Sequence, residues 1–272
     1  MISYDFSGQV VVVTGAARGV GRQIVIGFTS TGASVIAADR DAVGLDETIG
    51  LAGGGATPIT ADISTADGAA SIIGAAMERF GRLDVCVNNA AVAPHASLLE
   101  ERVEVWDQVY AVNCRGTFLM TQAAARVLIE QGSGGRIINF SSGVTKRGSA
   151  GAAAYASSRA ATESFSRVAA IELAPHEILV NTVSPGLIDT QPKPLPPRMA
   201  KALSSRIPNL PLARPGEPDE VAALVLWLAS EASSYVAGAV YEVDGGASVG
   251  SRSTEPIIDD DPRYDWVTGR TR

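Results

Sequence analysis

The sequence predicts a doubly wound α/β fold, in which a seven-stranded, mainly parallel sheet is covered by helices on both faces. Short apolar runs alternate along the chain with stretches that have helical spacing. The early apolar runs are rich in Val and Ile and nearly continuous, which is typical of strands covered on both faces. At 272 residues, the chain is long enough to form one large domain.

The seven expected strands are the apolar runs, taken in chain order. The first reads QVVVVT and leads into a glycine-rich turn, and the last reads AVYEVDGG. Runs of this length and composition, bounded by Gly, Pro, Asn, Asp or Ser, favour strands over helices. The expected strands cover residues 9–14, 33–38, 56–60, 83–89, 135–141, 178–184 and 239–246.

Stretches with helical spacing separate these strands, so each strand is expected to return to the sheet through a helix. One region breaks this alternation, because eight prolines lie between residues 191 and 218. No long regular element can run through it, although RMAKALSSR is compatible with a short helix. The expected helices cover residues 19–31, 42–52, 65–80, 99–111, 114–131, 152–174 and 218–229.

The organisation that follows is one Rossmann-like domain over residues 1–246, with a proline-rich lid at about 187–216. Residues 247–272 form a C-terminal extension without clear periodicity. Two interpretations of this extension stay open. It is either a solvated terminus or a segment that docks on a neighbouring subunit through Tyr264 and Trp266.

Composition excludes several classes of function. A formal net charge of −7 repels phosphate backbones and acidic membrane surfaces, so nucleic acid and membrane partners are not expected. No apolar run approaches the ~20 residues needed to span a bilayer, and no charged segment precedes an apolar stretch at the start. Cys86 and Cys114 have no ligand-like spacing, and both are expected to be buried and reduced. These features favour a cytoplasmic protein without a metal site.

The glycine-rich turn TGAARGVG, at residues 14–21, follows the first expected strand and opens a helix. Gly15, Gly19 and Gly21 let the backbone approach a ligand where a Cβ would collide. The helix N-terminus offers free N–H groups to a pyrophosphate. A tight turn alone would explain the glycines, but a strand before, a helix after and an acidic residue ending the next strand favour dinucleotide binding.

That acidic residue is Asp39. A carboxylate there accepts hydrogen bonds from the hydroxyls of an adenosine ribose and repels a 2′-phosphate. NAD is therefore the expected cofactor, and NADP is the less favoured alternative. Arg18 and Arg40 are the counter-evidence, because either could reach such a phosphate unless it is solvated or paired with Asp39.

Together, the motifs resemble those of the short-chain dehydrogenase/reductase (SDR) family, from about residue 6 to residue 246. After TGAARGVG come ADI (61–63), NNAA (88–91), Asn113, Ser141–Ser142, YASSR (155–159), PGLIDT (185–190) and VDGG (243–246). The resemblance implies four catalytic residues, Asn113, Ser142, Tyr155 and Arg159. The cofactor-binding residues that it implies are Gly15, Arg18, Gly19, Val20, Gly21, Asp39, Asp62, Ile63, Asn89, Ala90, Tyr155, Arg159, Pro185, Gly186, Ile188 and Thr190.

The chemistry centres on Tyr155. Hydride transfer between a carbinol carbon and a nicotinamide requires an oxygen to lose or gain a proton. An unperturbed phenol has a pKa of about 10 and is a poor base at neutral pH. A cation ~5 Å away, at an effective dielectric of ~20, favours the phenolate by about 3 kcal/mol. Ser142 is expected to hydrogen-bond the substrate oxygen and hold it near Tyr155.

Arg159 departs from the family pattern, which has lysine at this position. It lies one helical turn after Tyr155, keeps the charge and can donate to ribose hydroxyls. Its planar head is larger than an ammonium and stays protonated, so a relay through a lysine proton is in doubt. Three interpretations remain: a functional replacement, a slow or specialised enzyme, and an NAD-binding protein without redox turnover.

The expected substrate is a small, largely apolar secondary alcohol or ketone, interconverted with NAD as the cofactor. This expectation follows from mostly apolar candidates for the pocket wall, such as Val92, Val144 and Leu187. The alternative within the family is a 3-oxoacyl-carrier reductase, a role that requires a basic docking face, which the acidic balance does not support. The resemblance also implies a homotetramer, with the helices near 99–131 and 152–174 at one interface and the last strand at another.

Overall fold

The computed structural model describes residues 4–190 and 194–252. All seven expected strands form, and they make one sheet of order β3-β2-β1-β4-β5-β6-β7 in which every pair of neighbouring strands is parallel. The strands are β1 (Val10–Thr14), β2 (Ser34–Asp39), β3 (Ala56–Thr60), β4 (Val85–Asn88), β5 (Gly135–Phe140), β6 (Ile178–Pro185) and β7 (Val240–Val243).

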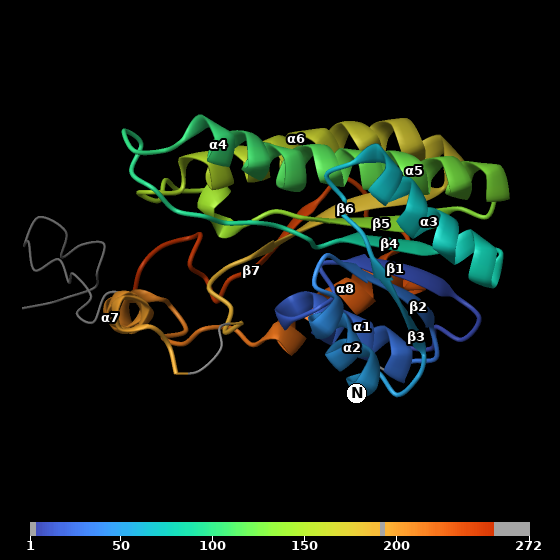
Figure 1. Ribbon diagram of the computed structural model, residues 1–272, viewed down its shortest axis with the longest axis horizontal. Helices are drawn as coiled ribbons and strands as arrows, with labels where there is room; N and C mark the ends of the chain where they lie inside the picture. Colours follow the sequence, from blue (N-terminus) through green and yellow to red (C-terminus); the bar gives the residue numbers. More distant parts are fainter. Residues whose placement is uncertain (1–3, 191–193, 253–272) are drawn as a thin grey trace, which may run out of the picture.

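Helices cover both faces of this sheet, with α3, α4, α5 and α6 on one side and α1, α2 and α8 on the other (Figure 1). The short helix α7 belongs to the proline-rich region, at one end of the molecule. The helices are α1 (Gly19–Ser30), α2 (Ala42–Leu51), α3 (Ala66–Phe80), α4 (Val103–Tyr110), α5 (Thr117–Gln131), α6 (Ala153–Leu173), α7 (Pro197–Arg206) and α8 (Pro218–Ala229).

The continuous apolar run of β1 shows why both faces must be covered. Val11 and Val13 pack into the core beneath α1 and α8, whereas Val10 and Val12 pack into the second core beneath α3 and α5. Successive side chains of a strand point to opposite faces. A strand without polar alternation therefore needs a helix layer on each side.

The helix from α4 to α5 departs from the expectation of two separate helices. A π-helical turn, Ala111–Gly116, joins them into one continuous path and contains Asn113. Such single wide turns commonly occur at functional positions in helices. The first of the two helices also begins at Val103 instead of residue 99, because Ser97 accepts from the N–H groups of Glu100 and Glu101 and closes a local turn.

The last strand is shorter than expected and ends at Val243. The Asp244 carboxylate accepts from the N–H groups of Gly246, at 2.8 Å, and Ser248, at 2.6 Å. These bonds turn the chain away from the sheet, and Gly246 takes a positive φ of 85°. The predicted contact residues Tyr264 and Trp266 lie outside the described residues.

Strand order reverses beside β1, since β2 lies on one side of it and β4 on the other. In open parallel sheets, a crevice forms at this point, outside the carboxyl ends of the strands. The glycine-rich turn after β1, Asp39 at the end of β2 and the NNAA segment after β4 all meet there. The fold therefore places the predicted site residues around one opening.

Candidate active site

A cleft of about 1300 Å³ opens at this edge of the sheet. Its walls come from loops that follow β1, β2, β3, β4, β5 and β6, and from α4 and α6. Most of the predicted residues line it: Gly15, Arg18, Gly19, Val20, Asp39, Asp62, Ile63, Asn89, Ala90, Ser142, Tyr155, Arg159, Pro185, Gly186 and Thr190.

Three predicted residues are not among those that line the cleft. A Cβ on Gly21 would lie 2.0 Å from the Gly15 carbonyl oxygen, so this glycine lets α1 pack against the turn. Asn113 is fully buried, and its amide bonds both the N–H and the carbonyl of Val92, each at 2.9 Å. Ile188 forms an isolated bridge to Gly216. All three support the walls instead of forming them.

The glycine-rich turn has the geometry of a cradle. Gly15 has a φ of 69°, and a Cβ there would lie 2.8 Å from the Cα of Ala90. The Asn89 side-chain amide donates to the carbonyls of Thr14, at 3.0 Å, and Gly15, at 3.1 Å. The end of β4 is thereby tied to the turn, and only glycine leaves the backbone this accessible at position 15.

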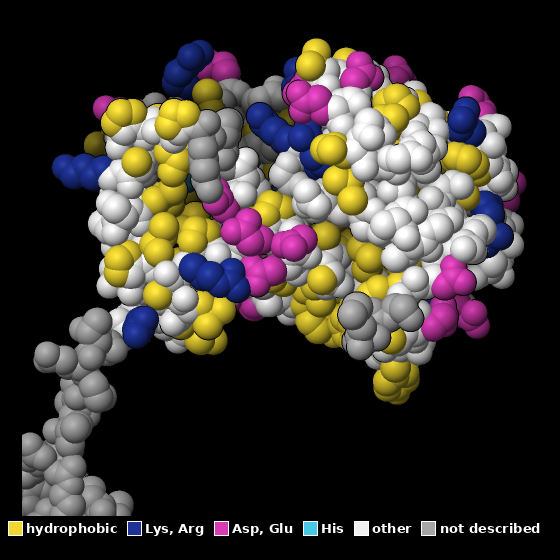
Figure 2. Space-filling view, turned by 90° about the horizontal axis from the view of Figure 1, so that it is seen from below, with side chains coloured by type: hydrophobic (Ala, Val, Ile, Leu, Met, Phe, Trp, Pro, Cys, Tyr) yellow, Lys and Arg dark blue, Asp and Glu magenta, His cyan; other side chains and the backbone are white. Residues whose placement is uncertain are grey.

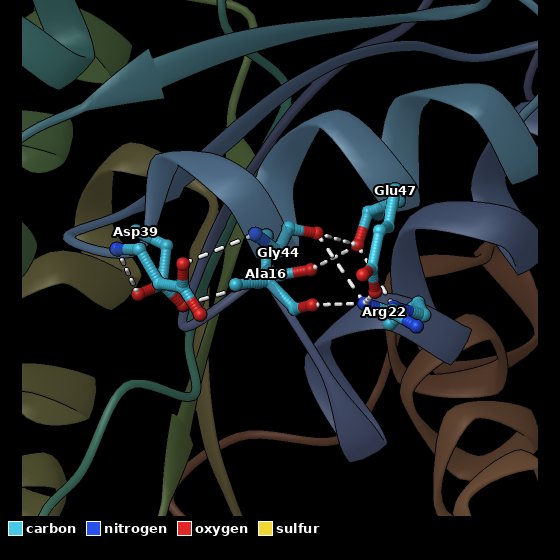
Figure 3. Close-up of polar contacts among 8 residues, drawn as sticks. Ala16, Arg22, Asp39, Gly44 and Glu47 are labelled. Carbon is cyan, nitrogen blue, oxygen red and sulfur yellow. Dashed lines mark hydrogen bonds and ion pairs between the residues drawn. The ribbon is translucent and has the colours of Figure 1, made fainter.

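Asp39 lies at the end of β2, where its carboxylate accepts three backbone N–H bonds. Oδ2 accepts from Ala17, at 3.0 Å, and Oδ1 accepts from Arg40, at 2.7 Å, and Asp41, at 3.1 Å. These bonds fix the carboxylate beside the glycine-rich turn (Figure 3). A negative charge is therefore held where the adenosine ribose of a dinucleotide is expected.

Arg22 supports the same region from α1. Its guanidinium donates to the carbonyl of Ala17, at 2.5 Å, to the hydroxyl of Thr48, at 3.0 Å, and to the carboxylate of Glu47, at 2.7 Å. Figure 3 shows this second set of contacts next to Asp39. The peptide unit of Ala17 thus gives its N–H to Asp39 while its own carbonyl accepts from Arg22.

Of the two alternatives left open for Arg40, the structure shows a largely exposed side chain and no ion pair with Asp39. Its Nε lies 3.7 Å from Oδ2 of Asp62, and only its backbone N–H reaches Asp39. Burial raises the pKa of Asp62, but hydrogen bonds from Ser64 and the charges of Arg40 and Arg115 outweigh it, and the net shift is downward. The Arg40 side chain therefore lies near Asp62, one of the predicted cofactor-binding residues.

Tyr155 begins the YASSR motif near the start of α6, at the wall of the cleft. Burial raises the pKa of its phenol. The positive charge of Arg159 and hydrogen bonds with Ser142 and Arg159 lower it by more, so the net pKa lies below the usual value of 10. The phenolate, the form that can accept a proton, is therefore easier to reach here than in a free tyrosine.

Arg159 is directed toward the tyrosine. Its guanidinium carbon lies 5.5 Å from the centre of the Tyr155 ring, and its Nη1 donates to the carbonyl of Phe140 at 2.7 Å. Only 3% of Arg159 is exposed. Within the described residues, its Nε has no hydrogen-bond partner. A charge and an unused donor are thus held in the wall of the cleft.

Sequence reasoning missed several residues that organise this site. Glu163, two turns after Tyr155 on α6, accepts from Ser141 and Thr145 on either side of Ser142. The available signal was a charged residue that continues the Tyr155–Arg159 spacing by four positions. Arg22 and Arg115 gave no such signal, because they act through distant segments, Arg22 through Thr48 and Glu47 and Arg115 through the Ser64 carbonyl.

Metal chemistry and the cysteines contribute little here. Among residues 4–190 and 194–252, no group of three or more His, Cys, Asp or Glu side chains could hold a metal ion. Cys86 is buried and its thiol pKa is raised to about 12 by burial. Cys114 is only partly buried, contrary to expectation, because it lies at a surface hollow with Tyr110 and Phe118.

The parallel sheet, the glycine cradle and the acidic strand end define a dinucleotide-binding protein, and the serine and tyrosine in the same cleft indicate an oxidoreductase. The family model described as enoyl-(acyl carrier protein) reductase matches residues 15–248. The chain belongs to the short-chain dehydrogenase/reductase family.

Relatives and solved structures agree with this assignment. The chain is 38% identical over 244 residues to 3-oxoacyl-[acyl-carrier-protein] reductase FabG of Thermotoga maritima, which covers 88% of this chain and 97% of the relative. It is 38% identical over 247 residues to (3R)-3-hydroxyacyl-CoA dehydrogenase of Mus musculus, covering 86% and 94%. The crystal structure of levodione reductase superimposes with a TM-score of 0.85 and 29% identity, covering 90% and 99%.

Proposed function

We propose that this protein interconverts 3-hydroxyacyl and 3-oxoacyl thioesters with NAD as the hydride carrier. The observation that carries the proposal is the joint placement of Ser142, Tyr155 and Arg159 in one cleft with Asp39. The serine and tyrosine support alcohol–ketone chemistry, and the acidic strand end supports NAD over NADP. The acyl thioester is supported by the two relatives whose names specify such substrates.

The described residues fit a nicotinamide dinucleotide. Gly15 and Gly19 leave space that a Cβ would fill, and α1 begins at Gly19, so its first N–H groups face the cradle. At the end of β2, three backbone N–H groups hold the Asp39 carboxylate. In the described part of the chain, no side-chain ion pair compensates its charge. The unused Nε of Arg159 is a further donor in the cleft wall.

In this mechanism, the nicotinamide supplies or accepts the hydride when bound. During oxidation, the Tyr155 phenolate accepts the hydroxyl proton of the substrate while the carbinol hydrogen departs with its electron pair. During reduction, the Tyr155 phenol donates that proton to the new alkoxide. Ser142 hydrogen-bonds the reacting oxygen, and Arg159 holds the phenol in the more acidic state that both directions require.

A second candidate substrate is a small, largely apolar ketone that carries no thioester. The levodione reductase structure supports it by similarity. The apolar residues Val92, Ala93 and Pro94 in the cleft wall support it by chemistry. Figure 2 shows hydrophobic side chains gathered over the end of the molecule that carries α7, with both acidic and basic side chains around them. This mixed border does not single out a basic docking face for a carrier protein.

The test follows the absorbance of reduced cofactor with two substrate sets, acetoacetyl-CoA and acetoacetyl-carrier protein in one, free cyclic and acyclic ketones in the other. We expect faster turnover with the thioesters, a preference for NADH over NADPH, and loss of turnover in Tyr155→Phe. Faster turnover of free ketones would favour the second candidate. Cofactor binding without turnover of either set would establish a binding protein and overturn both.

The remaining assignments are proposals of the same kind. We assign residues 1–246 to the catalytic domain, with a substrate lid at about 187–216, and residues 247–272 to a C-terminal extension. The assembly is a homotetramer in the cytoplasm. Within the described residues, no helix is both long and apolar enough to cross a membrane.

A further inference from the structure

Glu163 is a buried carboxylate that the mechanism above does not use. It lies on α6 two turns after Tyr155 and one turn after Arg159, and only 6% of it is exposed. It is not among the residues that line the cleft, so it has no direct route to a substrate or cofactor. Burying a carboxylate is costly unless hydrogen bonds compensate for lost hydration.

The compensation comes from two hydroxyl groups on either side of Ser142. Glu163 Oε1 accepts from Ser141 Oγ at 2.6 Å and from Thr145 Oγ1 at 2.7 Å. Both distances are in the range of charge-assisted hydrogen bonds. Thr145 Oγ1 also lies 3.1 Å from the carbonyl oxygen of Ser142. Its single hydroxyl proton goes to the Glu163 carboxylate, because that acceptor is closer and charged. The Ser142 carbonyl still accepts from the Thr145 backbone N–H at 3.0 Å.

Arg159 holds Phe140, the residue directly before Ser141, because its Nη1 donates to the Phe140 carbonyl. Two side chains of α6, one turn apart, thus grip Phe140, Ser141 and Thr145. Ser142 lies between these fixed points and lines the same cleft as Tyr155, whose pKa its side chain lowers. The same helix therefore carries the tyrosine and sets the position of the segment that presents the serine.

We propose that Glu163 is a positioning residue that fixes the Ser142 hydroxyl relative to Tyr155 through Ser141 and Thr145. A buried charge is weak evidence for stability, and hydrophobic replacements often stabilise such sites. A carboxylate that binds both flanks of a reactive serine is well suited to fixing geometry, and small displacements at a reacting centre reduce rate strongly. The proposal deepens the proposed function and rests on it for the role of Ser142.

Thr145 offers the cleanest test, because it can lose its hydroxyl while Glu163 stays. We expect Thr145→Val to lower kcat about tenfold, equivalent to about 1.4 kcal/mol, with the dissociation constant for NAD unchanged within about twofold. Thr145→Ser restores the hydroxyl and should restore kcat. Glu163→Gln keeps one oxygen acceptor without the charge and should give an intermediate loss. Thr121→Val, which removes another buried threonine hydroxyl, is the matched control and should leave kcat unchanged.

A second readout does not require turnover. Burial raises the pKa of Tyr155, whereas the Arg159 charge and the Ser142 hydrogen bond lower it. Spectroscopic titration of each variant against its own Tyr155→Phe partner isolates this phenol. Thr145→Val should raise the pKa of Tyr155, and Thr145→Ser should return it, while Arg159 supplies the same charge in both.

Unchanged kcat and unchanged phenol pKa in both Thr145→Val and Glu163→Gln would overturn the proposal. So would equal losses in Thr145→Val and Thr145→Ser, which would indicate a packing defect. If the parent protein turns nothing over but Thr145→Val still raises the phenol pKa, the proposed function fails while the positioning role stands.

Discussion

At the scale of single residues, the replacement of lysine by Arg159 is the most informative feature. Its guanidinium contacts both the Tyr155 ring and the Phe140 carbonyl, so it supplies charge and also holds the end of β5. A lysine ammonium lacks the planar guanidinium group that makes both of these contacts at a fixed geometry. The residue therefore combines an electrostatic role with a structural one.

Arg159→Lys should retain cofactor binding and change the rate by no more than about a hundredfold, equivalent to about 2.7 kcal/mol, because the positive charge is kept. The measurements are kcat in the reductive direction and the dissociation constant for NAD. Arg159→Met, which removes the charge at similar length, should lose more activity. Complete loss of NAD affinity in the lysine variant would count against the role given to this residue.

Asp39→Asn should shift cofactor preference toward NADP. The amide keeps an oxygen for the N–H groups of Arg40 and Asp41 but removes the charge that repels a 2′-phosphate. We expect the ratio of kcat/KM for NADP over NAD to rise at least about tenfold, or about 1.4 kcal/mol. Asp67→Asn, in the first turn of α3, is the charge-matched control and should leave the ratio unchanged.

At the scale of elements, the start of α8 is held by a compact acidic and basic cluster. Glu220 accepts from the backbone N–H of Glu217 at 2.7 Å, and its carboxylate pairs with both terminal nitrogens of Arg214, at 2.7 and 2.8 Å. The Arg214 hydrogen bonds, followed by the Glu217 backbone bond, lower the pKa of Glu220 from 4.5 to about 2. This capping box fixes the point at which the proline-rich region ends.

A pH-dependent contribution to stability follows. Because the folded pKa of Glu220 is depressed, its contribution is fully present above pH 4.5 and is lost as the pH falls toward 2. Urea unfolding should therefore show Glu220→Gln to be less stable than the parent at pH 7, and the difference should shrink from pH 4.5 downward. A difference that stays constant across this range would show that the carboxylate charge contributes nothing there.

Element positions were largely predictable from sequence, and the exceptions have identifiable causes. Apolar periodicity located all seven strands, because burial on both faces leaves a strong signal in runs such as Val10–Val13. It missed the π-helical turn at Ala111–Gly116 because hydrophobic spacing does not separate an α turn from a π turn. It missed the late start of α4 because a local backbone turn, in which the Ser97 carbonyl accepts from Glu100 and Glu101, decides it.

The site was predictable where a residue type carries its own chemistry. Gly15, Asp39, Ser142 and Tyr155 line the cleft as the motifs indicate. The supporting residues were not predictable, because Glu163 and Arg22 act through contacts between segments that only the fold brings together. The contact of Arg40 with Asp62 was not predictable for the same reason, since Asp62 follows a different strand.

At the scale of the whole molecule, an apolar surface lies on the outer side of α5 and α6. Phe118 is 41% exposed, Val168 52% and Ile171 75%, and Phe118 contacts Phe165 of the neighbouring helix edge to face. Exposed apolar side chains gathered on two adjacent helices are typical of an interface. The proposed homotetramer would bury this surface.

Ile171→Glu should weaken that assembly, because a charge would be buried at the interface. Sedimentation should give a tetramer for the parent and a species of about half or a quarter of that mass for the variant. The thermal midpoint of the variant should fall only as far as the loss of the subunit contacts explains. Val43→Glu, at an exposed position on α2 across the sheet, is the control and should stay tetrameric. A parent that sediments as a monomer would contradict the assembly.

One consequence of the guanidinium beside Tyr155 reaches beyond the cleft. Arginine keeps its proton throughout the range in which proteins remain folded, whereas a lysine in the same place would begin to lose its own near pH ~10. Alcohol oxidation should therefore climb with alkalinity to a level plateau, and the lysine variant should decline beyond it, as initial rates between neutral and strongly basic buffers will show. The proposed catalytic centre would therefore keep its activity at a pH where one that carries lysine loses it.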